Sequence, residues 1–151
     1  MISELTSADI GCILQNAPFF WKEINGDELM SPFNNKTFFN FLKNGFANDV
    51  LVGWKYVEND IFHGSILFSK DYVAMTNCTI LNEIFWWMSP EKRNTTYSFK
   101  LIKKAEEYAK LNQIDYVMMA CMENPRPERL TQFYKKIGYS PVQTQFYKKI
   151  K

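Results

Sequence analysis

The sequence has few of the residues that build metal centres and disulfide frameworks. One histidine, His63, and three cysteines, Cys12, Cys78 and Cys121, are spread over 151 residues, and no Cys-x-x-Cys motif occurs. An odd number of distant cysteines predicts buried, reduced thiols rather than disulfides or a metal site. Because the sequence implies no Ser or Cys partner for His63, we expect its imidazole on the surface of a strand.

Long apolar segments are also missing. No apolar run approaches the roughly 20 residues that a membrane-spanning helix needs. The first residues, MISELTSADI, carry acidic side chains where a signal peptide would carry basic ones. With 46% hydrophobic and 23% charged residues, the composition is that of a globular protein. We therefore expect one soluble domain over residues 1–151, located in the cytoplasm and without a membrane partner.

Charge is unevenly distributed along the chain. Residues 1–90 contain 5 basic and 10 acidic side chains, whereas residues 91–151 contain 13 basic and 6 acidic ones. A basic half suits a polyanionic partner such as a nucleic acid, a phosphoprotein or a phosphorylated cofactor. A solvated lysine-rich surface is the alternative, and composition alone leaves both open.

Hydrophobic periodicity predicts two helices and a hairpin in the N-terminal half. Thr6 or Ser7 is expected to cap a helix to about Gln15, and Asn35 a second helix that stops near Gly45. Residues 16–35 are loop-like. Two strands, Val50–Val57 and Ile61–Ser69, are expected to flank a turn at Glu58-Asn59-Asp60, with a loop over 71–79.

The C-terminal half predicts a β-α-β unit. Ile84–Met88 is apolar at every position, which is typical of a strand buried on both faces. Helical spacing follows over residues 95–110, and Ile114–Met122 is a second apolar strand. A crossover of this kind makes its two strands parallel. The expected fold class is therefore α/β, with a mixed sheet and helices on both faces.

The septet TQFYKKI occurs twice, at Thr131–Ile137 and Thr144–Ile150. The first copy continues a helical apolar pattern that ends at Gly138, a typical residue after a helix C-terminus. The second follows Pro141, and its alternation predicts a strand over Val142–Lys149. Two copies are too few for a repeat architecture.

The stretch from Glu83 to Lys149 resembles the GNAT superfamily of N-acetyltransferases. Met88-Ser-Pro followed by Arg93-Asn-Thr-Thr-Tyr-Ser98 stands where the family has V-x-P and R-x-x-G-x-G/A, and Tyr134-Lys-Lys-Ile-Gly-Tyr139 stands where it has Y-x-x-x-G-F. The phrase E-x-F-W-W-x-x-P looks like the acetyltransferases of bacteriophages, which implies a host-cytoplasm location. Both loop glycines of the family are replaced here, by Thr96 and Ser98.

The resemblance implies binding of acetyl-CoA and transfer of its acetyl group to an amine. Backbone N–H groups at the start of the long helix would hold the pyrophosphate, and the Met88 backbone would pair with the pantetheine arm. The implied cofactor-binding residues are Met88, Lys92, Arg93, Asn94, Thr95, Thr96, Tyr97, Ser98 and Asn124.

The same resemblance assigns catalytic roles to two residues. Glu83 is expected to be the general base and Tyr134 the acid that serves the leaving thiolate. The alternatives are an ordinary strand-end carboxylate and a core tyrosine, and Asp115 and Glu123 are weaker candidates for the base. No cysteine lies on the acetyl-lining strand or beside the histidine in sequence, which favours direct transfer in a ternary complex over an acetyl-enzyme.

Two other interpretations stay open. A GNAT fold without catalysis could act as a binding module in a phage–host contact or a virion, and the Thr96 and Ser98 replacements favour it. Nucleic-acid binding is a third interpretation, without a recognised motif. The acceptor amine, small molecule or protein, cannot be identified from the sequence. Phe19, Phe20 and Trp21 either line its pocket or pack in the core. A homodimer is also left open.

Overall fold

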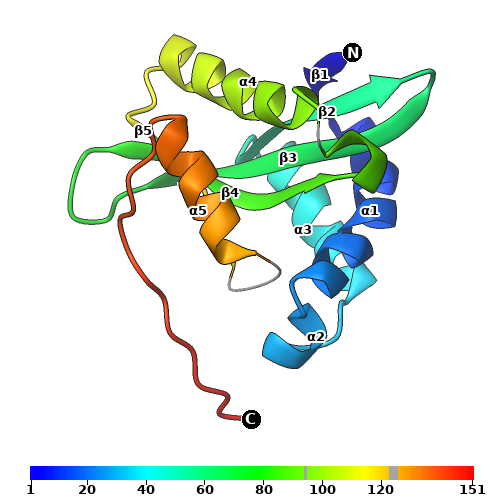
Figure 1. Cartoon of the computed structure of the whole chain (residues 1–151), viewed down its shortest axis with the longest axis horizontal. Coiled ribbons are helices and arrows are strands. Elements are labelled where there is room, and N and C mark those ends of the chain that lie inside the picture. Colours follow the sequence, from blue (N-terminus) through cyan, green and yellow to red (C-terminus); the bar gives the residue numbers. More distant parts are fainter. Residues whose placement is uncertain (94, 123–125) are drawn as a thin grey trace.

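A computed structural model describes residues 1–93, 95–122 and 126–151 (Figure 1). Within these residues five strands form one sheet in the order β1-β2-β3-β4-β5. They are β1 (Ile2–Glu4), β2 (Leu51–Glu58), β3 (Ile61–Tyr72), β4 (Thr79–Met88) and β5 (Tyr116–Met118). Neighbouring strands pair antiparallel except β4 and β5, which are parallel. The predicted mixed sheet is confirmed, and β1 is an addition to it.

Helices cover both faces of this sheet, as expected (Figure 1). On one face lie α1 (Ile10–Glu23) and α3 (Asn35–Ala47), and the short α2 (Gly26–Leu29) connects them. On the other face lie α4 (Tyr97–Leu111) and α5 (Pro127–Lys136). Two 3-10 turns, η1 (Ser7–Asp9) and η2 (Pro90–Lys92), precede α1 and α4.

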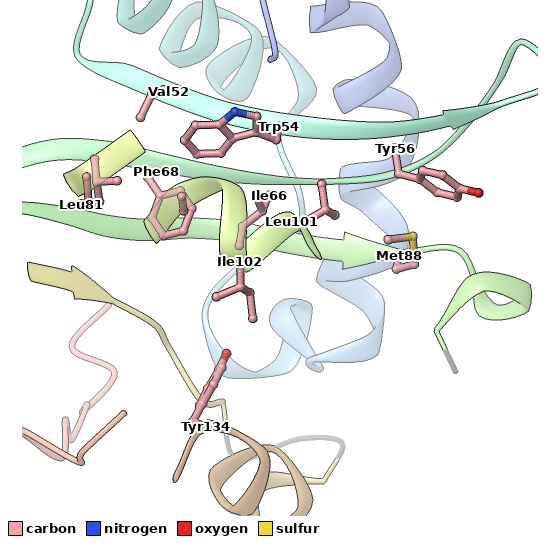
Figure 2. Close-up of a cluster of buried hydrophobic side chains, with 12 residues drawn as sticks. Val52, Trp54, Tyr56, Ile66, Phe68, Leu81, Met88, Leu101, Ile102 and Tyr134 are labelled. Atoms are coloured by element: carbon pink, nitrogen blue, oxygen red, sulfur yellow. The ribbon is translucent and has the colours of Figure 1, made fainter. Parts of the chain in front are cut away.

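Each face has its own hydrophobic core, because alternate strand residues point to opposite sides. Leu67, Phe85 and Trp87 pack with Ile13 and Leu42 of α1 and α3. On the α4 side, buried residues of the strands and α4 form a second cluster, and Figure 2 shows Tyr134 pointing toward it from α5. The second core fixes the position of Tyr134 against the sheet.

The hairpin and the long helix lie close to the residues predicted for them from the sequence. Asn59 and Asp60 form the two-residue turn between β2 and β3, with φ of 51° and 61°. Asn and Asp tolerate this left-handed conformation better than most residues. The helix α4 buries Leu101, Ile102, Ala105 and Ala109, which follow the expected helical spacing.

The prediction of a loop over residues 16–35 is wrong. Helix α1 continues through Pro18 to Glu23, and α2 follows it. Ile13 and Ala17 are buried one turn apart, and Phe20 packs on the same core. This packing outweighs the local helix-breaking tendency of proline. The next helix is capped by Asn34, one residue before the expected Asn35. The Asn34 side chain accepts a hydrogen bond from the Thr37 N–H.

Strands β4 and β5 differ from their expected lengths. β4 begins at Thr79, so the preceding loop is shorter, and β5 has three residues instead of spanning Ile114–Met122. The parallel ladder runs from Ile80–Tyr116 to Asn82–Met118 and ends there. The two strands therefore separate at their C-terminal ends, as predicted.

The two septets have different structures. The first lies in α5 and is followed by Gly138 with φ of 99°, as expected. The predicted second strand is wrong, because residues 139–151 have no regular secondary structure. Val142, Phe146 and Ile150 are 78%, 92% and 87% exposed, so their apolar face has no neighbour to pack on. Without a paired edge, alternation alone does not make a strand.

Candidate active site

A β-bulge in β4 lies at the centre of the candidate site. Leu67 pairs with Phe85 and Phe68 pairs with Glu83, so Ile84 is skipped in the ladder. Ile84 and Phe85 both pack toward α1 and α3, whereas Glu83 reaches the segment that follows β5. The extra residue thus directs one carboxylate and one apolar pair to opposite sides of the strand.

Glu83 and Tyr134 meet at the two backbone groups of Ala120. The Ala120 N–H donates to Glu83 Oε2 at 2.8 Å, and Tyr134 Oη donates to the Ala120 carbonyl at 2.9 Å. Both backbone groups of Ala120 bind side chains instead of a neighbouring strand. This explains why β5 stops two residues earlier, and it brings together the two residues predicted to be catalytic.

The environment raises the pKa of both groups. Burial raises the pKa of Glu83 to about 7, although the hydrogen bond from Ala120 N–H opposes the rise. Burial also raises the pKa of Tyr134, and the nearby charge of Glu83 adds to that rise. At neutral pH the site therefore contains a carboxyl group near its midpoint of ionisation and a fully protonated phenol.

Cys121 lies closer to this site than the sequence suggested. It follows Ala120 directly and is exposed, so the expected buried thiol is wrong here. Its Sγ lies 3.5 Å from the Pro127 carbonyl oxygen and 3.6 Å from Thr131 Oγ1. Cys12 and Cys78 are half-buried. A thiol thus follows directly the Ala120 backbone that Glu83 and Tyr134 bind, although none is on β4.

The backbone before α4 does not require a glycine at position 96, where the GNAT motif has one and this chain has Thr96. Thr96 has φ of −70° and ψ of −9°, in the right-handed region open to any residue, and Ser98 lies in the first helical turn. Thr95 Oγ1 donates to the Lys92 carbonyl at 2.6 Å and fixes the turn. First-turn N–H groups of a helix lack intrahelical partners, so α4 presents donors despite the replacements.

The two cations expected at the phosphates are engaged by carboxylates. Lys92 Nζ pairs with Glu58, and Arg93 pairs with Glu23 at the end of α1. The Lys92 ammonium holds the pKa of Glu58 below its ordinary value. Arg93 Nε also donates to the Met88 carbonyl at 2.8 Å, which is the group expected to face the pantetheine arm.

The remaining expected cofactor residues divide into two groups. Tyr97 begins α4, and its ring stacks on Tyr56 with centroids 3.9 Å apart, which holds the helix N-terminus against β2. Asn94 and Asn124 lie outside the described residues. Partners such as Glu23 and Glu58 were missed, because nothing local marks contacts between residues so far apart in sequence.

His63 is buried, contrary to expectation. Its Nδ1 lies 3.3 Å from Ser89 Oγ and 3.2 Å from Glu91 Oε1, at the start of η2. The imidazole therefore links β3 to the turn that leads into α4. This contact supports the loop structurally and does not reach Glu83 or Tyr134.

A pocket of about 570 Å³ opens on the other side of β4. Ile84 and Phe85 form its strand side, and α1, the segment 30–34 that follows α2, and α3 surround the rest. Phe20 and Trp21 line it, and Phe20 also packs on the core of this face, whereas Phe19 is 58% exposed and stacks on Trp87. The sequence did not indicate the wall from α3, which includes Phe38 and Phe41.

Comparison with solved structures identifies the architecture. A GCN5-related N-acetyltransferase from Ralstonia eutropha JMP134 superimposes with a TM-score of 0.82 at 17% identity, over 99% of this chain and 97% of the other. The chain has the GNAT acetyltransferase fold. No protein-family model and no curated protein matches its sequence.

Two further structures with the GNAT fold carry ligands. A predicted acetyltransferase from Clostridium acetobutylicum, solved with acetyl-CoA, has a TM-score of 0.75 at 17% identity, over 99% of this chain and 95% of its own. An aminoglycoside acetyltransferase from an uncultured soil metagenomic sample, in complex with sisomicin, has a TM-score of 0.74 at 11% identity, over 100% and 96%. The structural neighbours of this GNAT fold are thus acetyltransferases.

None of the helices in the residues described is both long and apolar enough to cross a lipid bilayer. In the same part of the chain no group of three or more His, Cys, Asp or Glu side chains is arranged around a metal-sized space.

Proposed function

We propose that the protein is an acetyl-CoA-dependent N-acetyltransferase that works by direct transfer in a ternary complex. The observation that carries the proposal is the convergence of Glu83 and Tyr134 on Ala120, where β4 and β5 separate. The GNAT fold and the acetyltransferase neighbours support the same reaction. An expected likeness to bacteriophage enzymes in particular stays a prediction.

The residues at the start of α4 suit the phosphates of a bound cofactor. First-turn N–H groups of α4, that of Ser98 among them, would face the pyrophosphate, helped by the positive end of the helix dipole. Lys92 would interact with these phosphates as well as with Glu58, and Arg93 would interact with them as well as with Glu23. When bound, acetyl-CoA supplies an acetyl group activated as a thioester.

Glu83 would take the proton from the acceptor amine. An alkylammonium has a pKa of about 10.4 and an ordinary glutamate 4.5, so proton transfer between them is about 8 kcal/mol uphill. With the Glu83 pKa at about 7, the gap falls to roughly 5 kcal/mol. Burial therefore makes this carboxylate a stronger base while leaving much of it ionised at neutral pH.

Tyr134 would act as a hydrogen-bond donor to the leaving sulfur. A thiol has a pKa of about 8.5, well below that of a phenol whose pKa is raised by burial. Complete proton transfer from Tyr134 is therefore uphill, but a donated hydrogen bond stabilises the negative charge as it develops. The hydroxyl hydrogen can rotate away from the Ala120 carbonyl to do so.

Calorimetry with acetyl-CoA tests the cofactor site, with Ser98→Pro and Ser98→Ala as a matched pair. Proline removes the Ser98 N–H, and the first helical turn tolerates it. Alanine keeps the N–H and removes only the hydroxyl. A hydrogen bond to a charged group contributes about 1.5–3 kcal/mol, so Ser98→Pro should weaken binding at least tenfold and Ser98→Ala about twofold or less.

The thermal unfolding temperature of each variant shows whether the helix start has been kept. Equal losses in both variants would contradict a role for the N–H group. If the unaltered chain shows no heat and no thermal shift at millimolar acetyl-CoA, the fold serves as a non-catalytic binding module instead.

A further inference from the structure

The Arg93 side chain links the turn before α4 to the end of α1. Its Nη2 donates to Glu23 Oε1, and its Nε donates to the Met88 carbonyl at 2.8 Å. The same guanidinium lies over the Trp87 ring, 5.8 Å from the ring centroid. One side chain therefore connects the last residue of α1, the last residue of β4 and the turn that leads into α4.

Glu23 belongs to a tight corner, residues 21–31, which contains the end of α1 and the whole of α2. The Trp21 indole N–H donates to the Ser31 carbonyl at 2.9 Å. The Trp21 ring also packs so closely on Gly26 that an added Cβ would lie 2.3 Å from it. Because these contacts tie both ends of the corner together, we expect it to move as one unit when Glu23 is released.

The corner also forms one wall of the apolar pocket. Trp21, Met30 and Ser31 line the pocket from this side. On the other walls, Phe38 of α3 and Phe85 of β4 belong to the hydrophobic core of this face. The core therefore holds the opposite walls in place, and a movement of the corner changes the shape of the pocket.

The contacts of Arg93 put Glu23 in competition with a phosphorylated cofactor. Arg93 belongs to the turn whose charges are proposed to meet the phosphates of acetyl-CoA, and the Met88 carbonyl is the group expected to face the pantetheine arm. A guanidinium uses the same N–H groups to bind phosphate and carboxylate oxygens. Each N–H that turns to a phosphate is therefore lost to Glu23 or to Met88.

We propose that Arg93 couples cofactor binding to the corner: phosphates bound at the start of α4 draw the guanidinium from Glu23 and release residues 21–31. The inference rests on the proposed acetyltransferase function, which supplies the cofactor. Coupling between two binding events is reciprocal, so the pair with Glu23 weakens cofactor binding by the factor by which the cofactor weakens the pair. The Arg93 and Glu23 side chains are 39% and 35% exposed, which limits this factor to about two- to fivefold.

Calorimetry with acetyl-CoA on two glutamine variants measures the factor. Glu23→Gln removes the carboxylate that holds Arg93. Glu28→Gln is the control, because Glu28 is exposed on α2 and makes no ion pair among the residues described. Both variants lose one negative charge. Acetyl-CoA should bind Glu23→Gln about two- to fivefold more tightly than wild type, and Glu28→Gln with nearly wild-type affinity. Equal affinities of the two variants would overturn the coupling while the cofactor site stands.

Hydrogen exchange shows whether the corner is released. Its amides include Leu29 and Met30, which donate to the Asn25 and Gly26 carbonyls at 2.9 and 2.8 Å, so their exchange reports local opening. Saturating acetyl-CoA should speed exchange over residues 21–31 about two- to fivefold and should not speed it in the central strand β3. In Glu23→Gln these amides should exchange faster from the start and respond little to the cofactor.

These measurements separate failure of this inference from failure of the proposed function. Acetyl-CoA that binds without speeding exchange in the corner would overturn the inference and leave the acetyltransferase function intact. Release of the corner without any acetyl transfer would support the coupling and count against catalysis. If the unaltered chain does not bind acetyl-CoA, both proposals are wrong.

Discussion

Replacing Glu83 with glutamine should stabilise the protein at alkaline pH and inactivate it at the same time. The folded chain holds this carboxyl group at a pKa of about 7, against an ordinary value of 4.5. Between these two values the folded chain binds more protons than the unfolded chain, so the free energy of unfolding falls as pH rises through this window. Above pH 7 the loss is complete. Glutamine does not titrate and escapes it.

The size of the effect follows from the two pKa values. The full difference corresponds to a penalty of about 3 kcal/mol at pH 8 and about 1 kcal/mol at pH 5. Because Glu83 is only half-buried, solvent screens part of this, and we expect Glu83→Gln to gain roughly 1–2 kcal/mol between pH 5 and pH 8. For about 150 residues, that is a relative rise in Tm of about 2–8 °C.

Thermal unfolding of both proteins at pH 5, 6, 7 and 8 measures the difference, and acetyl-transfer rates are taken at the same pH values. The wild-type kcat/KM should rise with pH on a limb near pH 7, and Glu83→Gln should lower turnover at least 100-fold. A stability difference that does not change with pH would show that Glu83 is solvated like an ordinary glutamate. In that case Glu83 is no stronger a base than an exposed glutamate.

The remaining predictions concern Tyr134, the route of acetyl transfer, and two glycines, one in the sheet and one in a helix. Tyr134→Phe keeps the ring but loses the hydroxyl. It should lower turnover roughly ten- to a thousand-fold and change the affinity for acetyl-CoA little. Tyr147 is exposed in the tail, so the control Tyr147→Phe should match wild type in steady-state assays. Cys121→Ala should keep turnover within about twofold if transfer is direct, and no acetylated enzyme should be seen by intact mass measurement; loss of activity with a trapped adduct would establish the covalent route. Gly53→Ala would place its Cβ 2.3 Å from the Ile66 carbonyl oxygen and should cost about 1–3 kcal/mol. Gly11→Ala, which meets open space in a helix, should gain about 0.5–1 kcal/mol in denaturant unfolding.

Local patterns were sufficient for much of the fold. The hairpin at Asn59-Asp60 and the helix α4 depend on side chains a few residues apart, so alternation and helical spacing located them. The tail after Gly138 shows the limit of this reasoning. Its alternating apolar residues favour a strand, but a strand also needs a paired edge, and the local sequence cannot say whether one is present.

The candidate site was also predictable only in part. Its two expected catalytic residues do converge, because the strand order and α5 follow the family pattern. The ion pairs of Lys92 and Arg93 join residues 34 and 70 positions apart in sequence. No spacing rule marks such contacts. The bulge at Ile84 was also hidden, since an uninterrupted apolar run gives no sign of which residue leaves the ladder.

The duplicated septet provides an internal gauge of the folded state. In the copy within α5, Tyr134 is 7% exposed, whereas in the tail copy Phe146 is 92% exposed and Tyr147 is 60% exposed. An antibody raised against the peptide TQFYKKI would therefore find one accessible epitope on the native chain and two on the unfolded chain. Because both epitopes have the same sequence, the ratio of bound antibody to protein reports unfolding of α5 without any added label.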